Sequence, residues 1–183
     1  MNKNIISERW NKTYLSLSDE KKEKIDALNK TDPAKYQLLT IKRNYSYPQI
    51  GDVFIVKPRN DICLYGLVLN NHISNNNGEE QLCVIIMKNG MDISFVSSRK
   101  NHLLPPIILT DIYWKKGFFT TVCHIDKITI DSYGFYSIGK GKIFDEYGNE
   151  LNKTPKLIGT YGVSTIYGVA MEINRELIVS GLI

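Results

Sequence analysis

Two short segments of this chain hold residue types that can do chemistry. The first is the Gly-Lys-Gly-Lys run at residues 139–142, which carries the glycines and lysines that phosphate-binding loops use. In such a loop the glycines stand between a strand and a helix, and Ser or Thr follows the lysine. Here Ile143 and Phe144 follow instead, and then a turn. The run therefore indicates a lysine-bearing β-hairpin rather than a phosphate site.

The second segment places Cys123 next to His124, with Asp126 two residues later. These are the residue types of a nucleophile, a general base and an orienting acid. Neighbours in a strand point to opposite faces, so Cys123 and His124 do not meet through simple strand geometry. The three cysteines also lie far apart inside apolar runs, without the close spacing of a zinc site or a disulfide framework. We predict no catalytic residue, no cofactor and no metal site, and hence a protein that is not an enzyme.

A set of basic and hydroxyl side chains offers one enzymatic alternative. Residues 51–56, Gly-Asp-Val-Phe-Ile-Val, resemble the opening strand of the SH3-like barrels of growth-inhibiting ribonucleases. Those proteins hold and cleave a phosphodiester with clustered basic and hydroxyl groups. The side chains available for that role are Arg43, Lys57, Arg59, Ser97, Ser98, Arg99 and Lys100. The alternative function is thus an RNA-binding or RNA-cleaving protein of toxin–antitoxin type, although such a cluster is more often a solvated rim.

Composition and charge narrow the class of protein. The chain has 183 residues, 43% hydrophobic and 23% charged, which is typical of a globular domain with a real core. The whole net charge of +4 lies in residues 1–43, and the remainder is balanced. A neutral β domain does not favour a nucleic-acid partner. No apolar run approaches the roughly 20 residues of a membrane helix, and the start lacks a signal-peptide core. We expect a cytoplasmic protein with no membrane partner.

The sequence predicts two consecutive parts of the chain, and we expect them to fold as one unit. Residues 1–46 form the N-terminal helical segment. Ser16 or Ser18 can cap a first helix, and Asp32 followed by Pro33 is a second start signal. These signals predict two short helices in tandem within residues 16–43.

From residue 47 the pattern changes to that of an antiparallel β-rich domain, which covers residues 47–183. Two apolar runs flank a polar turn at residues 57–61 and predict an opening β-hairpin. A polar loop follows at residues 70–80, a tight turn at 88–91, and Pro105-Pro106 is expected to interrupt the sheet. Residues 164–179 fit a C-terminal helix or a strand. The predicted strands are 51–57, 62–69, 81–88, 92–97, 117–123, 126–131, 134–139 and 142–145.

The predicted fold class is therefore α+β, with N-terminal helices followed by a strongly twisted antiparallel sheet or half-barrel. The chain holds eleven Tyr, six Phe and two Trp, and several of these aromatic residues fall at turns or beside glycines. Exposed aromatic and Arg side chains are typical anchors of protein interfaces. The candidate partner-binding residues are Arg59, Tyr65, Trp114, Tyr133 and Tyr147.

The opening hairpin carries a family resemblance. Residues 50–56 (Ile-Gly-Asp-Val-Phe-Ile-Val), a polar turn and residues 65–69 (Tyr-Gly-Leu-Val-Leu) resemble the start of the immunity protein 26 family. Residues 114–118 and the closing Tyr161-Gly162 follow in a similar order, so the resemblance covers residues 47–175. It implies a small cytoplasmic bacterial protein of a polymorphic-toxin system, which binds a cognate toxin protein and blocks it by direct contact. A plain interaction module for another partner is the remaining alternative.

Overall fold

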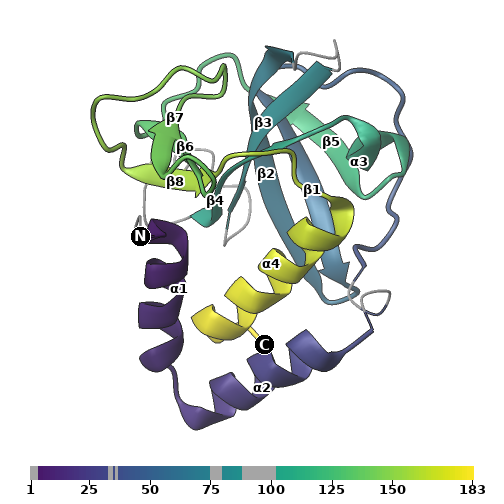
Figure 1. Ribbon diagram of the computed structural model, residues 1–183. Helices are drawn as coiled ribbons and strands as arrows, with labels where there is room; N and C mark the ends of the chain where they lie inside the picture. Colours follow the sequence, from purple (N-terminus) through teal and green to yellow (C-terminus); the bar gives the residue numbers. More distant parts are fainter. Residues whose placement is uncertain (1–3, 33–34, 36, 75–79, 88–101) are drawn as a thin grey trace.

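The computed structural model describes residues 4–32, 35, 37–74, 80–87 and 102–183 of the chain (Figure 1). In this part of the chain four helices and eight strands are present. The helices are α1 (Ile5–Leu15), α2 (Asp19–Lys30), α3 (Ile112–Lys115) and α4 (Ile166–Ser180). The strands are β1 (Asp52–Arg59), β2 (Ile62–Ser74), β3 (Glu80–Met87), β4 (His102–Leu109), β5 (Phe119–His124), β6 (Tyr133–Ser137), β7 (Lys142–Phe144) and β8 (Leu157–Thr160). The α+β class is confirmed, whereas the strong twist or half-barrel stays a prediction.

The larger sheet has five antiparallel strands in the order β4-β3-β2-β1-β5. The predicted opening hairpin is confirmed, because β1 pairs with β2 around the polar turn. Strand β2 runs on to Ser74, so the predicted loop at 70–80 is wrong for residues 70–74. Asn70 pairs there with Cys83, and Ile73 with Gln81. Pairing with the adjacent apolar strand β3 thus extends β2 through a polar sequence.

The expectation that Pro105-Pro106 interrupts the sheet is wrong. Both prolines lie inside β4. The pairs Val84↔Ile107 and Ile86↔Leu104 flank a register shift, so two residues of β4 oppose one residue of β3 at this point. β4 is also an edge strand of the sheet. A bulge on an edge strand is where a sheet tolerates residues without an N–H donor.

The smaller sheet has the order β7-β6-β8. The β6–β7 pair is antiparallel, and the β6–β8 pair is parallel. The sequence did not predict β8. Conversely, the strand predicted at 126–131 is not formed, although Ile128 and Ile130 pack half-buried against an apolar cluster. The predicted strand at 92–97 and the predicted turn at 88–91 lie outside the described residues.

The N-terminal segment is helical only in its first part. The helix expected after Ser18 is confirmed as α2, and α1 precedes it with Asn4 as its capping residue. The second predicted helix is wrong for residues 37–43, which form neither helix nor strand and lie beside the sheet. The N–H of Leu39 donates to the carbonyl of Lys57 at 2.8 Å, and Leu38 is buried in the main core. Hydrogen bonds to other segments and burial of Leu38 thus outweigh the local helix signals.

The alternative between helix and strand near the C-terminus is decided in favour of helix α4. Its side chains Val169, Ala170, Ile173 and Leu177 are buried in the main core, which also contains the apolar side chains of one face of the larger sheet. Helices α1 and α2 flank α4 (Figure 1), and Ile25 and Leu28 of α2 pack with Ile178. None of the helices in the described ranges combines the length and the apolar character needed to span a membrane.

Candidate functional site

A hollow of about 250 Å³ lies where the end of β2 and the start of β3 meet the turn that follows β7. Its lining includes Ser74, Gln81, Ile108, Glu146, Tyr147 and Tyr161, and we call it the tyrosine hollow. Local geometry fixes two of its walls. The Asp145 carboxylate accepts hydrogen bonds from the N–H groups of Tyr147 and Asn149, at 2.9 and 2.8 Å, which closes the turn. On the other side the N–H of Ser164 donates to the carbonyl of Ile108 at 2.7 Å.

A polar network joins two lining residues of the tyrosine hollow, Glu146 and Tyr147, to Asn70 and Tyr133, which are outside its lining. Oε1 of Glu146 accepts hydrogen bonds from the Tyr133 hydroxyl at 2.7 Å and from Nδ2 of Asn70 at 3.0 Å. The same Asn70 Nδ2 is 2.6 Å from the Tyr147 hydroxyl oxygen, and Asn70 is only 7% exposed. Burial, followed by the neighbouring Cys83 and Glu146, raises the pKa of Tyr133 well above its usual range. Tyr133 therefore remains a neutral hydrogen-bond donor.

The rim of the tyrosine hollow is exposed and partly apolar. Tyr147 is 60% exposed, Tyr161 39% and Val163 47%. The Tyr161 ring rests against Phe144, with 5.4 Å between the ring centroids. The rim thus presents large side chains that are accessible to another molecule and partly fixed in position.

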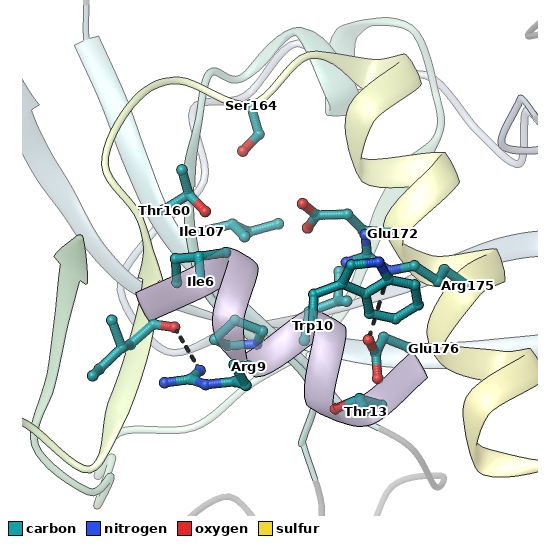
Figure 2. Close-up of a pocket in the computed structure, with 13 residues that line it drawn as sticks. Ile6, Arg9, Trp10, Thr13, Ile107, Thr160, Ser164, Glu172, Arg175 and Glu176 are labelled. Atoms are coloured by element: carbon teal, nitrogen blue, oxygen red, sulfur yellow. Dashed lines mark hydrogen bonds and ion pairs between the residues drawn. The ribbon is translucent and has the colours of Figure 1, made fainter. Parts of the chain in front are cut away.

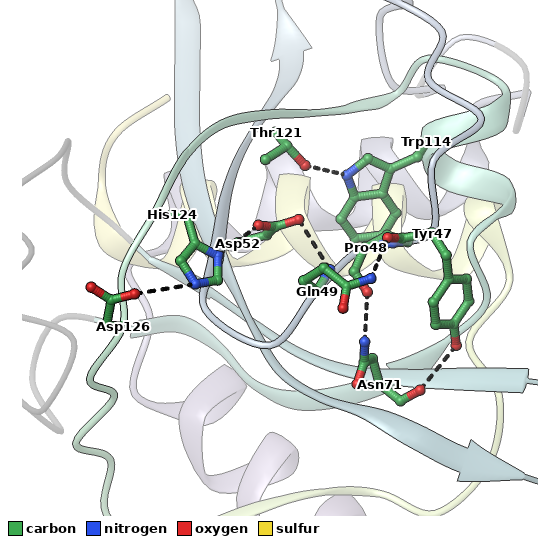
Figure 3. Close-up of polar contacts among 9 residues, drawn as sticks. All are labelled: Tyr47, Pro48, Gln49, Asp52, Asn71, Trp114, Thr121, His124 and Asp126. Atoms are coloured by element: carbon green, nitrogen blue, oxygen red, sulfur yellow. Dashed lines mark hydrogen bonds and ion pairs between the residues drawn. The ribbon is translucent and has the colours of Figure 1, made fainter.

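Trp114 is not a surface anchor, which corrects one of the candidate residues. It is fully buried and packs at a steep angle against the rings of Phe54 and Phe119, with ring centroids 5.0 and 5.2 Å away. Its Nε1 donates to the Thr121 hydroxyl at 3.0 Å (Figure 3). The short helix α3 turns this side chain into the core immediately before β5, so in the folded protein it cannot contact a partner.

The other candidate residues lie in different environments. Tyr147 lines the tyrosine hollow, and Tyr133, which is outside its lining, is linked to it through Glu146 and Asn70. Tyr65 is half-buried and packs against an apolar cluster on the second face of the larger sheet. Arg59 is exposed and lines a separate hollow between α2 and α4. The structure thus joins two of the five predicted residues at one site. Asn70, Glu146 and Tyr161 were not among the predicted residues, because no local pattern marks residues that meet from distant segments.

His124 has a partner that sequence spacing did not indicate. Its Nδ1 is 3.0 Å from Oδ1 of Asp52, and its Nε2 is 3.8 Å from Oδ1 of Asp126 (Figure 3). Asp52 faces His124 across the β1–β5 pair. Cys123 is half-buried and packs against the apolar cluster that contains Val53 and Leu67. The His124 side chain is 48% exposed and lines none of the hollows described here. The arrangement is an Asp–His contact at the sheet rim and not a Cys–His pair.

A smaller hollow of about 130 Å³ lies beneath α1, between it and α4 (Figure 2). The Arg175 guanidinium lies 4.4 Å from the centre of the Trp10 ring, and Arg9 donates to the carbonyl of Ile158 at 3.4 Å. Glu172 points into this hollow (Figure 2). Burial raises the pKa of Glu172, and Arg175 partly opposes that shift. These contacts attach α1, which has no buried residue of its own, to the rest of the molecule.

Within the described ranges, no group of three or more His, Cys, Asp or Glu side chains is placed to hold a metal ion. The comparisons with known proteins add no relative. No protein-family model, no curated protein and no solved structure matches this chain.

Proposed function

We propose that this chain is an immunity protein, which binds a cognate bacterial toxin by direct contact and neutralises it without catalysing a reaction. That the partner is a toxin is implied by the resemblance of residues 50–69 to the immunity protein 26 family. The structural observation that carries it is the tyrosine hollow, where Tyr147, Tyr161 and Val163 are exposed beside a concave surface. Accessible aromatic side chains around a concavity are typical anchors of protein interfaces.

The polar groups of the tyrosine hollow fit binding better than catalysis. Glu146 accepts two hydrogen bonds, and Tyr133 is held as a neutral donor. Groups that are already oriented lose little conformational freedom when a partner binds, which favours affinity. Among the described lining residues no His, Cys or Lys stands with Glu146 as a catalytic partner, so its carboxylate suits the role of a hydrogen-bond acceptor.

The proposal predicts that a neighbouring gene encodes a secreted toxin, and the test is to co-express that toxin with the chain. We expect the chain to restore growth and to co-purify with that toxin. A Tyr147→Ala, Tyr161→Ala double variant should weaken the complex by about 30-fold or more, which corresponds to about 2 kcal/mol for an interface hot spot. Tyr45→Ala is the matched control, because Tyr45 is 71% exposed and lies outside the tyrosine hollow.

Three outcomes would count against the proposal. Failure to restore growth and to co-purify would contradict the immunity function. An unchanged dissociation constant in the double variant would move the interface away from the tyrosine hollow. Growth arrest with cleaved RNA, on expression of the chain alone, would favour the RNA-cleaving alternative.

A further inference from the structure

Glu146 is the one charged side chain among the described residues that line the tyrosine hollow. Among the described residues that form it, Glu146 is acidic and none is Lys or Arg. The remaining lining consists of neutral polar, aromatic and aliphatic side chains. A concave surface of this kind favours a cationic group, since a carboxylate with low-dielectric walls focuses a negative potential.

The geometry of Glu146 leaves room for a further donor. Both hydrogen bonds described for its carboxylate end on Oε1, from Tyr133 and from Asn70. No described residue is shown to donate to the second oxygen, Oε2, so a ligand that reaches Oε2 would displace neither bond. Glu146 also acts on the neighbouring Cys83. Burial, and after it the Glu146 carboxylate, raises the pKa of the Cys83 thiol.

The tyrosine rings that line the hollow add a second interaction that favours a cationic ligand. The faces of tyrosine rings attract cations, and a guanidinium combines this attraction with planar stacking and several N–H donors. Tyr147 and Tyr161 both line the hollow. Its volume of about 250 Å³ is several times the roughly 30 Å³ share of one water molecule. A flat cationic group thus finds an acceptor, two rings and sufficient space in one place.

We propose that the tyrosine hollow binds the guanidinium group of an arginine presented by the protein partner, with Oε2 of Glu146 as the acceptor and the rings of Tyr147 and Tyr161 as walls. This inference rests on the proposed function and specifies the chemistry of its contact. The partner segment is accordingly basic at the point where it enters the hollow.

The first test uses the isolated chain and a small probe. N-acetyl-arginine methylamide is titrated into the labelled protein, and N-acetyl-citrulline methylamide serves as its uncharged counterpart. We expect saturable chemical-shift changes at the amides of Tyr147, Tyr161 and Gly162 with the arginine probe, and binding at least about tenfold weaker with citrulline. Absence of saturable changes, or equal binding of the two probes, would overturn the inference.

The variant Glu146→Gln removes the charge and keeps the shape and an acceptor for Tyr133. It should weaken binding of the arginine probe by at least about tenfold. Glu150→Gln is the matched control, because Glu150 is exposed and pairs with Lys142 at the surface. Tyr161→Leu, which leaves the Glu146 network intact, provides a second variant if Glu146→Gln does not fold, and it should weaken binding several-fold. Equal binding by the folded variants and the control would overturn the assignment.

A second measurement separates this inference from the proposed function. The dissociation constant of the toxin complex is measured for the wild type, Glu146→Gln and Glu150→Gln. A loss of about tenfold or more in Glu146→Gln alone would support the inference. If Glu146→Gln binds the toxin as the wild type does, the arginine contact is wrong and the proposed function stands. If the arginine probe binds in the hollow but no toxin complex forms, the guanidinium preference is supported and the proposed function is wrong.

Discussion

The five-stranded and the three-stranded sheets differ in how they are built. In the five-stranded sheet each strand pairs antiparallel with its neighbours, and apolar side chains cover both faces. The three-stranded sheet is assembled from short strands, and its parallel pair joins residues 133–136 to residues 157–160. The main core lies on the first sheet, whereas exposed tyrosines and a charged network lie beside the second.

The aromatic side chains show what this difference means. Phe54 and Phe119 stack at 4.5 Å between ring centroids, and both are fully buried. Beside the smaller sheet, Tyr133 is held through its hydroxyl group, and Tyr147 is largely exposed. We infer that the larger sheet provides most of the folding free energy, while the smaller sheet positions groups at the surface for binding.

The largest expected effect is that of Gly66→Val in the larger sheet. A Cβ atom at residue 66 would lie only 2.2 Å from Cζ of Phe54, which is packed against Trp114 and Phe119 and cannot move aside. Overpacking of this kind typically costs about 1–3 kcal/mol and more where the neighbours cannot yield. We expect the cooperative unfolding transition to be lost, as followed by circular dichroism.

Gly139→Val is the matched control, since nothing lies within 4 Å of a Cβ atom built there. If both glycine variants melted at the wild-type temperature, the larger sheet would not be the rigid part of the molecule.

Trp114→Ala and Tyr147→Ala compare an aromatic side chain from each region. Removing a buried tryptophan leaves a cavity, and we expect Trp114→Ala to lower the free energy of unfolding by about 3–5 kcal/mol. Tyr147→Ala should lower it by less than about 1 kcal/mol, because the side chain is largely exposed. Urea denaturation measures both values. Similar losses in the two variants would contradict the division of roles between the sheets.

Tyr133→Phe tests whether the polar network beside the smaller sheet also contributes to folding. The change removes the hydrogen bond to Glu146, and hydrogen bonds to charged groups contribute about 1.5–3 kcal/mol. We expect a loss of about 1–2 kcal/mol in urea denaturation, with little change for the exposed control Tyr45→Phe. A neutral result would show that the network orients the hollow without stabilising the fold.

The smallest effect concerns Glu172 beneath α1, and it depends on pH. Burial raises the pKa of Glu172 above the ordinary value of 4.5, so the folded protein holds the proton more tightly than the unfolded chain. The contribution of Glu172 to stability is then lost as the pH rises from 4.5 through the higher folded pKa.

Glu172→Gln removes this dependence. The melting temperature of the variant minus that of the wild type should increase as the pH rises above 4.5. Below that value this difference should be constant. A difference that is constant with pH would mean that Glu172 titrates alike in the folded and unfolded states.

Local patterns predicted the elements that short stretches of sequence mark directly. The opening hairpin was predicted from two apolar runs around a polar turn, and α2 from residue types that favour a helix start. Strand β8 was missed, since it has only four residues and its pairing with β6 and its packing depend on distant segments. A Cβ atom at Gly159 of β8 would lie 2.1 Å from the carbonyl oxygen of Pro106, so this strand needs a glycine where it meets β4.

Of the candidate site residues, the structure links Tyr133 and Tyr147 in one polar network and buries Trp114 in the core. Composition marks an aromatic residue as a suitable anchor, but burial decides whether it can touch a partner. Tyr113 and Trp114 sit on one short helix and are both buried, because the chain returns into β5 directly after them. The sequence predicted the strand that follows, but the burial of Tyr113 and Trp114 depends on the distant side chains that pack around them.

Three properties follow from the amino-acid sequence without the fold: the order of helices before strands, the location of the excess positive charge and the hairpin that carries the family resemblance. These properties depend on residue types and short spacings. The tyrosine hollow exists only in the folded protein, because Asn70 and Glu146 are separated by 76 residues and meet only after the two sheets have packed. The tertiary structure also decided which tyrosines are exposed, since burial is a property of the packed chain and not of any single segment.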